Sequence, residues 1–167
     1  PAIAGLDIAY VPENMGIFAD LTVKENMLLA ARSAKRAQQM DTKRLEWIFR
    51  LFPAVEKFWN HPAGKLSGGQ KQMLAVARAI VEPRKLLIVD EPSKGLAPAI
   101  INNMIDAFAQ LKQTGTTILL VEQNISFAKR LGDHVAVMDN GRAVHSGAMA
   151  ELADNEDLQH ALLGLAI

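Results

Sequence analysis

Two adjacent carboxylates, Asp90 and Glu91, follow directly on the apolar run Leu86–Val89. A run that is uniformly apolar, rather than alternating, predicts a strand buried on both faces of a parallel sheet. In open α/β sheets, ligands bind beyond the carboxyl ends of the strands. An acid in that place can hold Mg²⁺, and a second acid can orient an attacking water. Two exposed acids in a turn would leave the same pattern, so the pair needs a second signal beside it.

The second signal is the stretch 66–70, which reads Leu-Ser-Gly-Gly-Gln. Ser67, followed three residues later by Gln70, predicts a capping box at the start of a helix. Gly68 and Gly69 have no side chains to cover the backbone N–H groups at the helix N-terminus, where the helix dipole favours an anion. The stretch fits a capped helix alone and also fits a phosphate site, and its local physics does not decide between the two.

The rest of the chain predicts the elements that must position these residues. A strand over 6–11 precedes an almost purely helical segment, which Thr22 and Glu25 open with a second capping box. Alternating strands and helices follow, and this alternation predicts an α/β protein with a parallel sheet. The expected helices before the second strand run from Thr22 to about Ala37, from Asp41 to Phe52, over 55–59 and from Lys71 to about Val81. The strand 86–89 and a second buried strand, 116–121, come next, with helices 98–115 and 124–131, a hairpin turning at Asn140-Gly141, and terminal helices near 149–153 and 158–163.

Composition excludes several classes of protein. The 167 residues carry 18 basic and 18 acidic side chains, so bulk charge gives no reason to expect a nucleic-acid partner. The chain has no cysteine, which rules out disulfides and thiolate chemistry. Its apolar runs fall short of the roughly 20 residues that a membrane-spanning helix needs.

The two motifs together resemble the ATP-binding cassette (ABC) family of ATPases, and the resemblance covers nearly the whole chain. The stretch 66–70 stands as the family's signature motif, and 86–91 looks like its Walker B strand, with Asp90 at the magnesium position and Glu91 at the general-base position. The resemblance implies a P-loop NTPase-like parallel-sheet core, ATP and Mg²⁺. The other motifs of the family would be the Q-loop at 10–13, the D-loop at 93–98 and the switch region at 121–124. The resemblance also implies three structural parts: an α/β core over 1–21 and 82–147, an inserted helical subdomain over 22–81 and C-terminal helices over 148–167.

Three positions depart from the general pattern of the family. Glu13 replaces the Q-loop glutamine, Gln123 the switch histidine and Ala97 the D-loop aspartate. In combination these variants resemble one subfamily, the ATPase subunits of importers for branched-chain amino acids and their relatives serving urea or short amides. Within that resemblance, Glu13 can hold Mg²⁺ or a water. Gln123 can donate a hydrogen bond to a γ-phosphate, but it carries no positive charge.

The resemblance implies a subunit that hydrolyses ATP to energise uptake of branched-chain amino acids or a related small polar solute. Its partners would be a second ABC ATPase subunit, as a homodimer or heterodimer, transmembrane permease subunits and, indirectly, a periplasmic solute-binding protein. Ser67, Gly68, Gly69 and Gln70 would meet the γ-phosphate held by the second subunit. Glu13, Ile17 and Phe18 would lie at the coupling contact with the permease, on the cytoplasmic face of the inner membrane, with no nucleic acid involved.

A fourth departure is the absence from these 167 residues of the phosphate loop Gly-x-x-x-x-Gly-Lys-Ser/Thr. In the family this loop precedes the Q-loop, so we expect the chain to be the C-terminal part of one ABC domain with an incomplete core. We expect these residues alone to hydrolyse no appreciable ATP, and we expect apolar surface on 86–89 and 118–121 to be left open. A soluble ABC ATPase acting on the ribosome or DNA, and a non-catalytic fragment, remain as alternatives.

Overall fold

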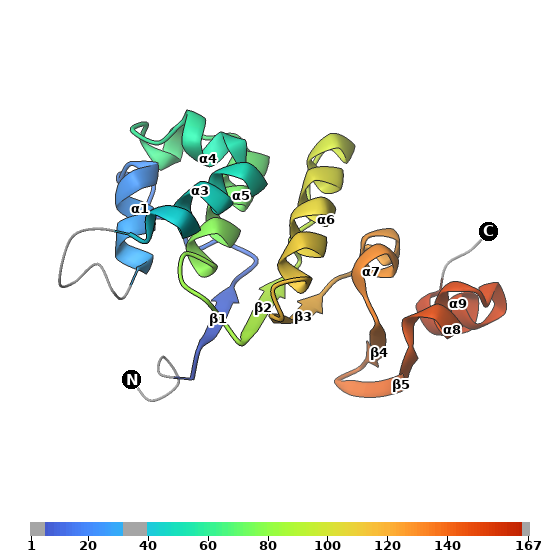
Figure 1. Ribbon diagram of the computed structural model, residues 1–167. Coiled ribbons are helices and arrows are strands. Elements are labelled where there is room, and N and C mark those ends of the chain that lie inside the picture. Colours follow the sequence, from blue (N-terminus) through green and yellow to red (C-terminus); the bar gives the residue numbers. More distant parts are fainter. Residues whose placement is uncertain (1–5, 32–39, 165–167) are drawn as a thin grey trace. The chain divides into compact units, whose positions relative to one another are not determined.

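The computed structural model describes residues 6–31 and 40–164. They form two compact units, the first extending to Gln123 and the second beginning at Asn124. Each unit has a sheet of its own, and the colours of Figure 1 follow the chain from one unit to the other. The predicted division into core, helical subdomain and C-terminal helices stays a prediction.

The first unit is built on a three-stranded parallel sheet in the order β1-β2-β3. The strands are β1 (Ile8–Val11), β2 (Leu86–Asp90) and β3 (Thr117–Val121). Pairing of β1 with β2 brings segments far apart in the sequence into register, and helices fill the intervals between the strands. The predicted α/β class with a parallel sheet is therefore confirmed.

The two faces of this sheet differ. On one face Val11, Leu87 and Val89 are almost completely buried. On the other face Tyr10, Leu119 and Val121 are 57%, 53% and 48% exposed. Since the side chains of a strand alternate between faces, only one of the two faces is covered by the described residues.

The prediction that 86–89 is buried on both faces is thus only half right for β2, and the prediction that 116–121 is a buried strand is wrong for β3. The residues of β3 alternate between exposed and partly buried, whereas β2 alternates between buried and partly buried. The reason is the covering layer: α5 packs against β1, and Figure 1 shows α5 and α6 on the same side of the strands. The expected open apolar surface is confirmed at Leu119 and Val121 but not at Leu87 and Val89.

The helical segment between β1 and β2 packs around its own apolar core. Its helices are α1 (Val23–Ala30), α3 (Thr42–Leu51), α4 (Pro53–Lys57), the 3₁₀ turn Ala63–Lys65 and α5 (Gly68–Ala79). Met27, Ile48, Phe52 and Leu74 are fully or almost fully buried there. Each such side chain stabilises the fold by about 1.5–3 kcal/mol relative to an exposed position.

Caps set most of the predicted helix starts. Thr22 and Ser67 each form the predicted capping box, and the Asp41 side chain accepts a hydrogen bond from the Arg44 N–H. The first helix nevertheless ends at Ala30, earlier than the predicted Ala37, because Ala31 has extended backbone angles. The rest of that predicted range, 32–39, lies outside the described residues.

Helix α6 (Pro98–Lys112) connects β2 to β3 and begins with the predicted proline at its first turn. Its apolar stripe is buried: Met104, Phe108 and Leu111 are each at most 2% exposed. Gly115 follows with a positive φ of 80° and turns the chain toward β3.

The second unit contains α7 (Ile125–Leu131), the antiparallel hairpin of β4 (His134–Asp139) and β5 (Arg142–Ala148), and the helices α8 (Met149–Ala153) and α9 (Glu156–Leu163). Asn140 and Gly141 have φ values of 47° and 76°, so the predicted Asn-Gly turn is confirmed. Buried Phe127 and Leu152 form its core. Among the described residues of both units, every helix is too short or too polar to span a lipid bilayer.

Candidate functional site

The first group of candidate residues lies at the N-terminus of α5. The Ser67 side chain accepts a hydrogen bond from the Gln70 N–H at 3.3 Å, and the Gln70 side chain accepts one from the Ser67 N–H at 2.9 Å. Within the part of the chain that the structure describes, the N–H groups of Gly68 and Gly69 have no hydrogen-bond partner. Ser67 and Gly68 are exposed, and nothing lies within 4 Å of a side-chain carbon built on Gly68. Two unpaired N–H groups at a helix N-terminus can bind an anion.

Gly69 has a second, structural reason to be glycine. A Cβ atom there would lie 2.9 Å from Cγ2 of Ile100, at the start of α6. Such a contact is shorter than carbon atoms accept, so the start of α5 sits against α6 only because Gly69 has no side chain.

The second group lies at the carboxyl ends of the three strands. Glu91 follows β2, and its N–H donates a hydrogen bond to the Val121 carbonyl at 2.9 Å. Its φ is +45°, in the left-handed region that an L-residue adopts at a cost of about 1–2 kcal/mol. The side-chain amide of Gln123, at the end of β3, donates a hydrogen bond to Oε1 of Glu91. The two residues predicted to be catalytic therefore touch each other.

Lys94 completes this cluster. Its ammonium nitrogen lies 3.1 Å from Oε2 of Glu91 and 2.5 Å from Oε1 of Glu13, which follows β1. The hydrogen bonds from Lys94 and Gln123 lower the pKa of Glu91 below its ordinary value. The hydrogen bonds to Glu13 and Glu91 raise the pKa of Lys94 to about 12. The Glu91 carboxyl group is thus held in its ionised form, which is the form that can accept a proton.

The Asp90 side chain is hydrogen-bonded to a residue of the neighbouring strand β1. The hydroxyl of Tyr10 donates a hydrogen bond to Oδ2 of Asp90 at 3.2 Å. Partial desolvation and then the contact with Asp90 raise the pKa of Tyr10. Tyr10 is paired with Ile88, and Asp90 follows Ile88 by two residues on the same strand. Since side chains alternate between the two faces, Tyr10 and Asp90 point to the same face of the sheet. This is the open face, so the Asp90 carboxylate is accessible from that side.

The loop after β1 is fixed by two side chains from the helical segment. The Asn26 amide, which is fully buried, donates to the Phe18 carbonyl at 2.9 Å and accepts from the Phe18 N–H at 3.1 Å. The guanidinium of Arg78 donates to the Gly16 carbonyl at 2.5 Å and lies 5.2 Å from the ring centre of Phe18. Burial lowers the pKa of Arg78. Phe18 is still 51% exposed, whereas Ile17 is partly buried.

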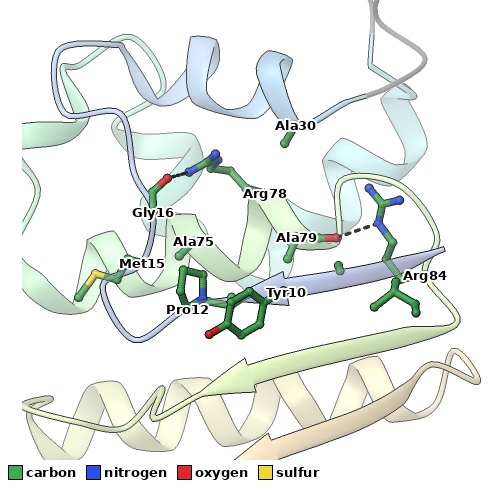
Figure 2. A pocket seen from close by; sticks show the side chains of 12 residues that line it. Tyr10, Pro12, Met15, Gly16, Ala30, Ala75, Arg78, Ala79 and Arg84 are labelled. Carbon is green, nitrogen blue, oxygen red and sulfur yellow. Dashed lines mark hydrogen bonds between the residues drawn. The ribbon is translucent and has the colours of Figure 1, made fainter. Parts of the chain in front are cut away.

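A pocket of about 220 Å³ lies beside this loop, between β1 and α5. Figure 2 shows Arg78 at one end, bonded to Gly16, and Arg84 at the other, bonded to the Ala79 carbonyl. Tyr10 is among the lining residues, but none of the predicted catalytic residues contributes to the pocket. The pocket is therefore separate from the cluster of Glu13, Glu91, Lys94 and Gln123.

The structure brings together three of the predicted residues: Lys94 bridges Glu13 and Glu91, and Gln123 binds Glu91 directly. Asp90 joins them as the residue before Glu91, while the residues 67–70 form their own group at the start of α5. Sequence reasoning placed Lys94 in the D-loop but gave it no role. Its position three residues after Glu91 was the available signal, because a turn brings residues at that spacing together.

The arrangement of acids also bears on metal binding. In the described ranges, no set of three or more histidine and acidic side chains is placed to hold a metal ion on its own. Mg²⁺ in nucleotide sites usually takes one or two carboxylates and completes its shell with phosphates and water. Asp90 and Glu13 are hard oxygen donors that fit this pattern.

Comparison with protein families finds that residues 2–94 match the family described as "ABC transporter". The high-affinity branched-chain amino acid transport ATP-binding protein BraG of Pseudomonas aeruginosa is 40% identical over 160 residues, covering 94% of this chain and 66% of BraG. The probable branched-chain amino acid transport ATP-binding protein LivF of Archaeoglobus fulgidus is 35% identical, covering 96% of this chain and 67% of LivF. The chain thus spans about two thirds of the length of these curated relatives.

Solved structures agree on the fold. An ATP-binding subunit of an ABC transporter superposes with a TM-score of 0.76 at 28% identity, covering 95% of this chain and 65% of that one. An ATP-binding cassette of an ABC transporter in its ADP conformation gives a TM-score of 0.74 at 21% identity, with 98% and 71% covered. The ABC ATPase fold predicted from the motifs is confirmed.

Proposed function

The chain belongs to the ABC transporter family, and from this premise we propose that it acts as the ATP-binding and ATP-hydrolysing subunit of an importer. The solute is a branched-chain amino acid or a related small polar molecule. Two relatives whose names specify branched-chain amino acid transport, at 40% and 35% identity, support this solute class. The variants Glu13, Ala97 and Gln123, which resemble the same subfamily, also support it.

The contacts of Glu91 carry the proposal. A carboxylate at the end of a central strand, kept ionised by Lys94 and oriented by Gln123, is suited to accept a proton from a water that attacks a γ-phosphate. Gln123 fixes the carboxylate through its amide and can turn the same N–H toward a phosphate oxygen. Because an amide does not titrate near neutral pH, this switch residue adds no pH dependence of its own.

Asp90 and Glu13 are proposed to hold Mg²⁺ together with the nucleotide phosphates. Bound there, the ion would neutralise charge on the β- and γ-phosphates. Asp90 has one oxygen engaged by Tyr10 and faces the open side of the sheet, and the Glu13 side chain is 54% exposed. Both carboxylates are therefore within reach of a ligand that approaches the carboxyl ends of the strands.

The residues 67–70 are proposed to act on the nucleotide of a second ATPase subunit. The unpaired N–H groups of Gly68 and Gly69, together with the Ser67 hydroxyl, supply donors for a γ-phosphate presented from outside. Two such subunits would enclose two ATP molecules. Ile17 and Phe18, in the loop held by Asn26 and Arg78, are proposed to contact transmembrane permease subunits at the cytoplasmic face of the membrane.

Replacement of Glu91 by glutamine tests the catalytic assignment. In a complete subunit carrying these residues and assembled with its permease, Glu91→Gln should lower ATP hydrolysis about 10²–10³-fold, because it removes the proton acceptor. Nucleotide affinity should change less than about twofold. Glu46→Gln, on the exposed side of α3, removes the same charge elsewhere and should leave hydrolysis unchanged.

Phosphate release and uptake of labelled leucine measure the two activities. Undiminished hydrolysis by the Glu91→Gln variant would remove Glu91 from the role of base. Hydrolysis that is stimulated by neither leucine nor any other small polar solute in the presence of its binding protein would contradict the importer assignment.

A further inference from the structure

Lys94 connects two carboxylates of the site, each of which follows a different strand of the sheet. It lies in the loop between β2 and α6, and its ammonium group bridges Glu13, after β1, and Glu91, after β2, at 2.5 and 3.1 Å. One positive charge thus occupies the space between two carboxylates. A divalent cation bound to either acid would need part of the same space.

The backbone around Lys94 is held by hydrogen bonds, whereas its side chain is largely exposed. The Ser93 N–H donates to a carboxylate oxygen of Glu122 at 2.8 Å, and the Lys94 N–H donates to the Glu91 carbonyl at 3.2 Å. The side chains of Lys94 and Glu13 are 60% and 54% exposed, whereas that of Glu91 is only 16% exposed. The contact with Glu13 is therefore an exposed ion pair that breaks at little cost, and the contact with Glu91 is the sheltered one.

We propose that Lys94 is a positioning residue that acts as an internal counter-ion: it ties Glu13 to Glu91 while no divalent cation is bound, and it must release Glu13 before that carboxylate can take Mg²⁺. After release, Lys94 stays on Glu91 and keeps that carboxylate in place beside Gln123. The inference rests on the proposed function, because that function assigns Glu13 to Mg²⁺. Its consequence is that the site binds the cation in competition with an ion pair of its own chain.

The chain contains a natural reporter for this competition. Tyr10 is the only tyrosine of the 167 residues, and its hydroxyl is bonded to Asp90. Paramagnetic Mn²⁺ bound at Asp90 should broaden the ring proton signals of Tyr10 in an NMR titration, and Mg²⁺ should reverse the broadening. The titration needs neither nucleotide nor turnover.

Lys94→Met should tighten Mn²⁺ binding about three- to fivefold, the effect expected from removing one exposed ion pair. Lys94→Arg keeps the charge and the bridge, so it should stay near the wild-type affinity. Lys85→Met removes the same charge at the exposed amino end of β2 and serves as the matched control, with no expected change. Asp90→Asn should abolish the broadening in every background.

A second pair of variants separates release of Glu13 from general charge repulsion. In a Glu13→Gln background, Lys94→Met should change Mn²⁺ affinity less than about twofold, because the ion pair is already absent. A full effect of Lys94→Met in that background would show that Lys94 only repels cations, and would overturn the inference.

Two other outcomes are distinguishable from each other. Equal affinities of the wild type and Lys94→Met, with broadening that Asp90→Asn abolishes, would overturn the role of Lys94 and leave the magnesium assignment standing. Broadening that Asp90→Asn does not affect, or none in any variant, would overturn the magnesium assignment of the proposed function together with this inference.

Discussion

Helices α1 and α5 begin with the same capping device and differ in what remains unpaired. At α1, the Glu25 N–H donates to Thr22 Oγ1 at 3.2 Å, and a Glu25 carboxylate oxygen accepts from the Thr22 N–H at 2.8 Å. Ser67 and Gln70 repeat this reciprocal pair at α5 with nearly the same distances. The capping box alone therefore does not distinguish a purely structural helix start from one proposed to bind a phosphate.

The difference lies in the first two N–H groups of each helix. At α1, the N–H groups of Val23 and Lys24 donate to the carbonyls of His61 and Trp59 at 3.0 and 2.9 Å. At α5, the corresponding groups of Gly68 and Gly69 have no partner within the described parts of the chain. The third residue of α1 is also a carboxylate, which repels anions, whereas that of α5 is a neutral amide. We call the start of α1 closed, because its first N–H groups are paired, and the start of α5 open, because the described residues leave those groups unpaired.

The largest expected effect comes from adding a negative charge at the start of α5 while keeping its capping box. Gln70→Glu converts the α5 cap into the Ser-x-x-Glu form and should leave stability unchanged within about 0.5 kcal/mol. It places a negative charge beside the proposed γ-phosphate position, where repulsion of a few kcal/mol should lower ATP hydrolysis about a hundredfold in the assembled transporter. Phosphate release and urea unfolding measure the two effects.

Glu25→Gln is the reciprocal control, because it makes α1 resemble α5 in charge while its N–H groups stay paired. Hydrolysis by this variant should equal that of the wild type. If Gln70→Glu is as active as the wild type, the start of α5 is a capped helix and nothing more.

A smaller effect separates the two glycines of the open start. Gly68→Ala adds a methyl group in empty space, whereas Gly69→Ala places one against Ile100. Overpacking of this kind costs about 1–3 kcal/mol, so Gly69→Ala should be less stable than Gly68→Ala by about that amount. Urea unfolding of the two variants gives the difference directly; equal stabilities would show that α5 and α6 can move apart at no cost.

The smallest expected effect is a pH dependence confined to the closed start. The hydrogen bonds from Thr22 lower the pKa of Glu25 below its ordinary value of 4.5. The ionised cap therefore stabilises the fold above pH 4.5, and this contribution is lost as the pH falls through the lowered pKa. Glu25→Gln should reduce the loss of stability between pH 6 and pH 3, whereas Gln70→Ala should leave the slope unchanged. Unfolding curves at several pH values would contradict the comparison if both variants changed the slope.

Much of the fold could be predicted from the sequence because its signals are local. The caps at Thr22, Asp41 and Ser67, the proline at the start of α6 and the Asn-Gly turn each depend on a few adjacent residues. The error at β3 has a different origin. An apolar strand predicts burial, but whether Leu119 and Val121 are covered depends on which elements pack on each face, and no pattern within the strand contains that information.

The site was predictable in part for the same reason. Asp90 and Glu91 stand next to each other in the sequence, and the motif at 66–70 is contiguous. In the bridge from Glu13 through Lys94 to Glu91, Glu13 and Lys94 are 81 positions apart in the sequence. It exists because β1 and β2 pair in parallel register and end at the same edge of the sheet, so it follows from topology and not from a local pattern. The unpaired state of the Gly68 and Gly69 N–H groups depends likewise on what the tertiary structure leaves uncovered.

The left-handed backbone of Glu91 has a consequence for the durability of the protein. Glycine adopts a φ of +45° without penalty, so the residue best suited to this position for thermal stability is one that cannot accept a proton. Keeping glutamate there exchanges about 1–2 kcal/mol of stability for the carboxylate that is proposed to accept the proton. A search for thermostable variants would therefore tend to remove this proposed proton acceptor, and engineered stability should be sought in the helical segment or the second unit instead.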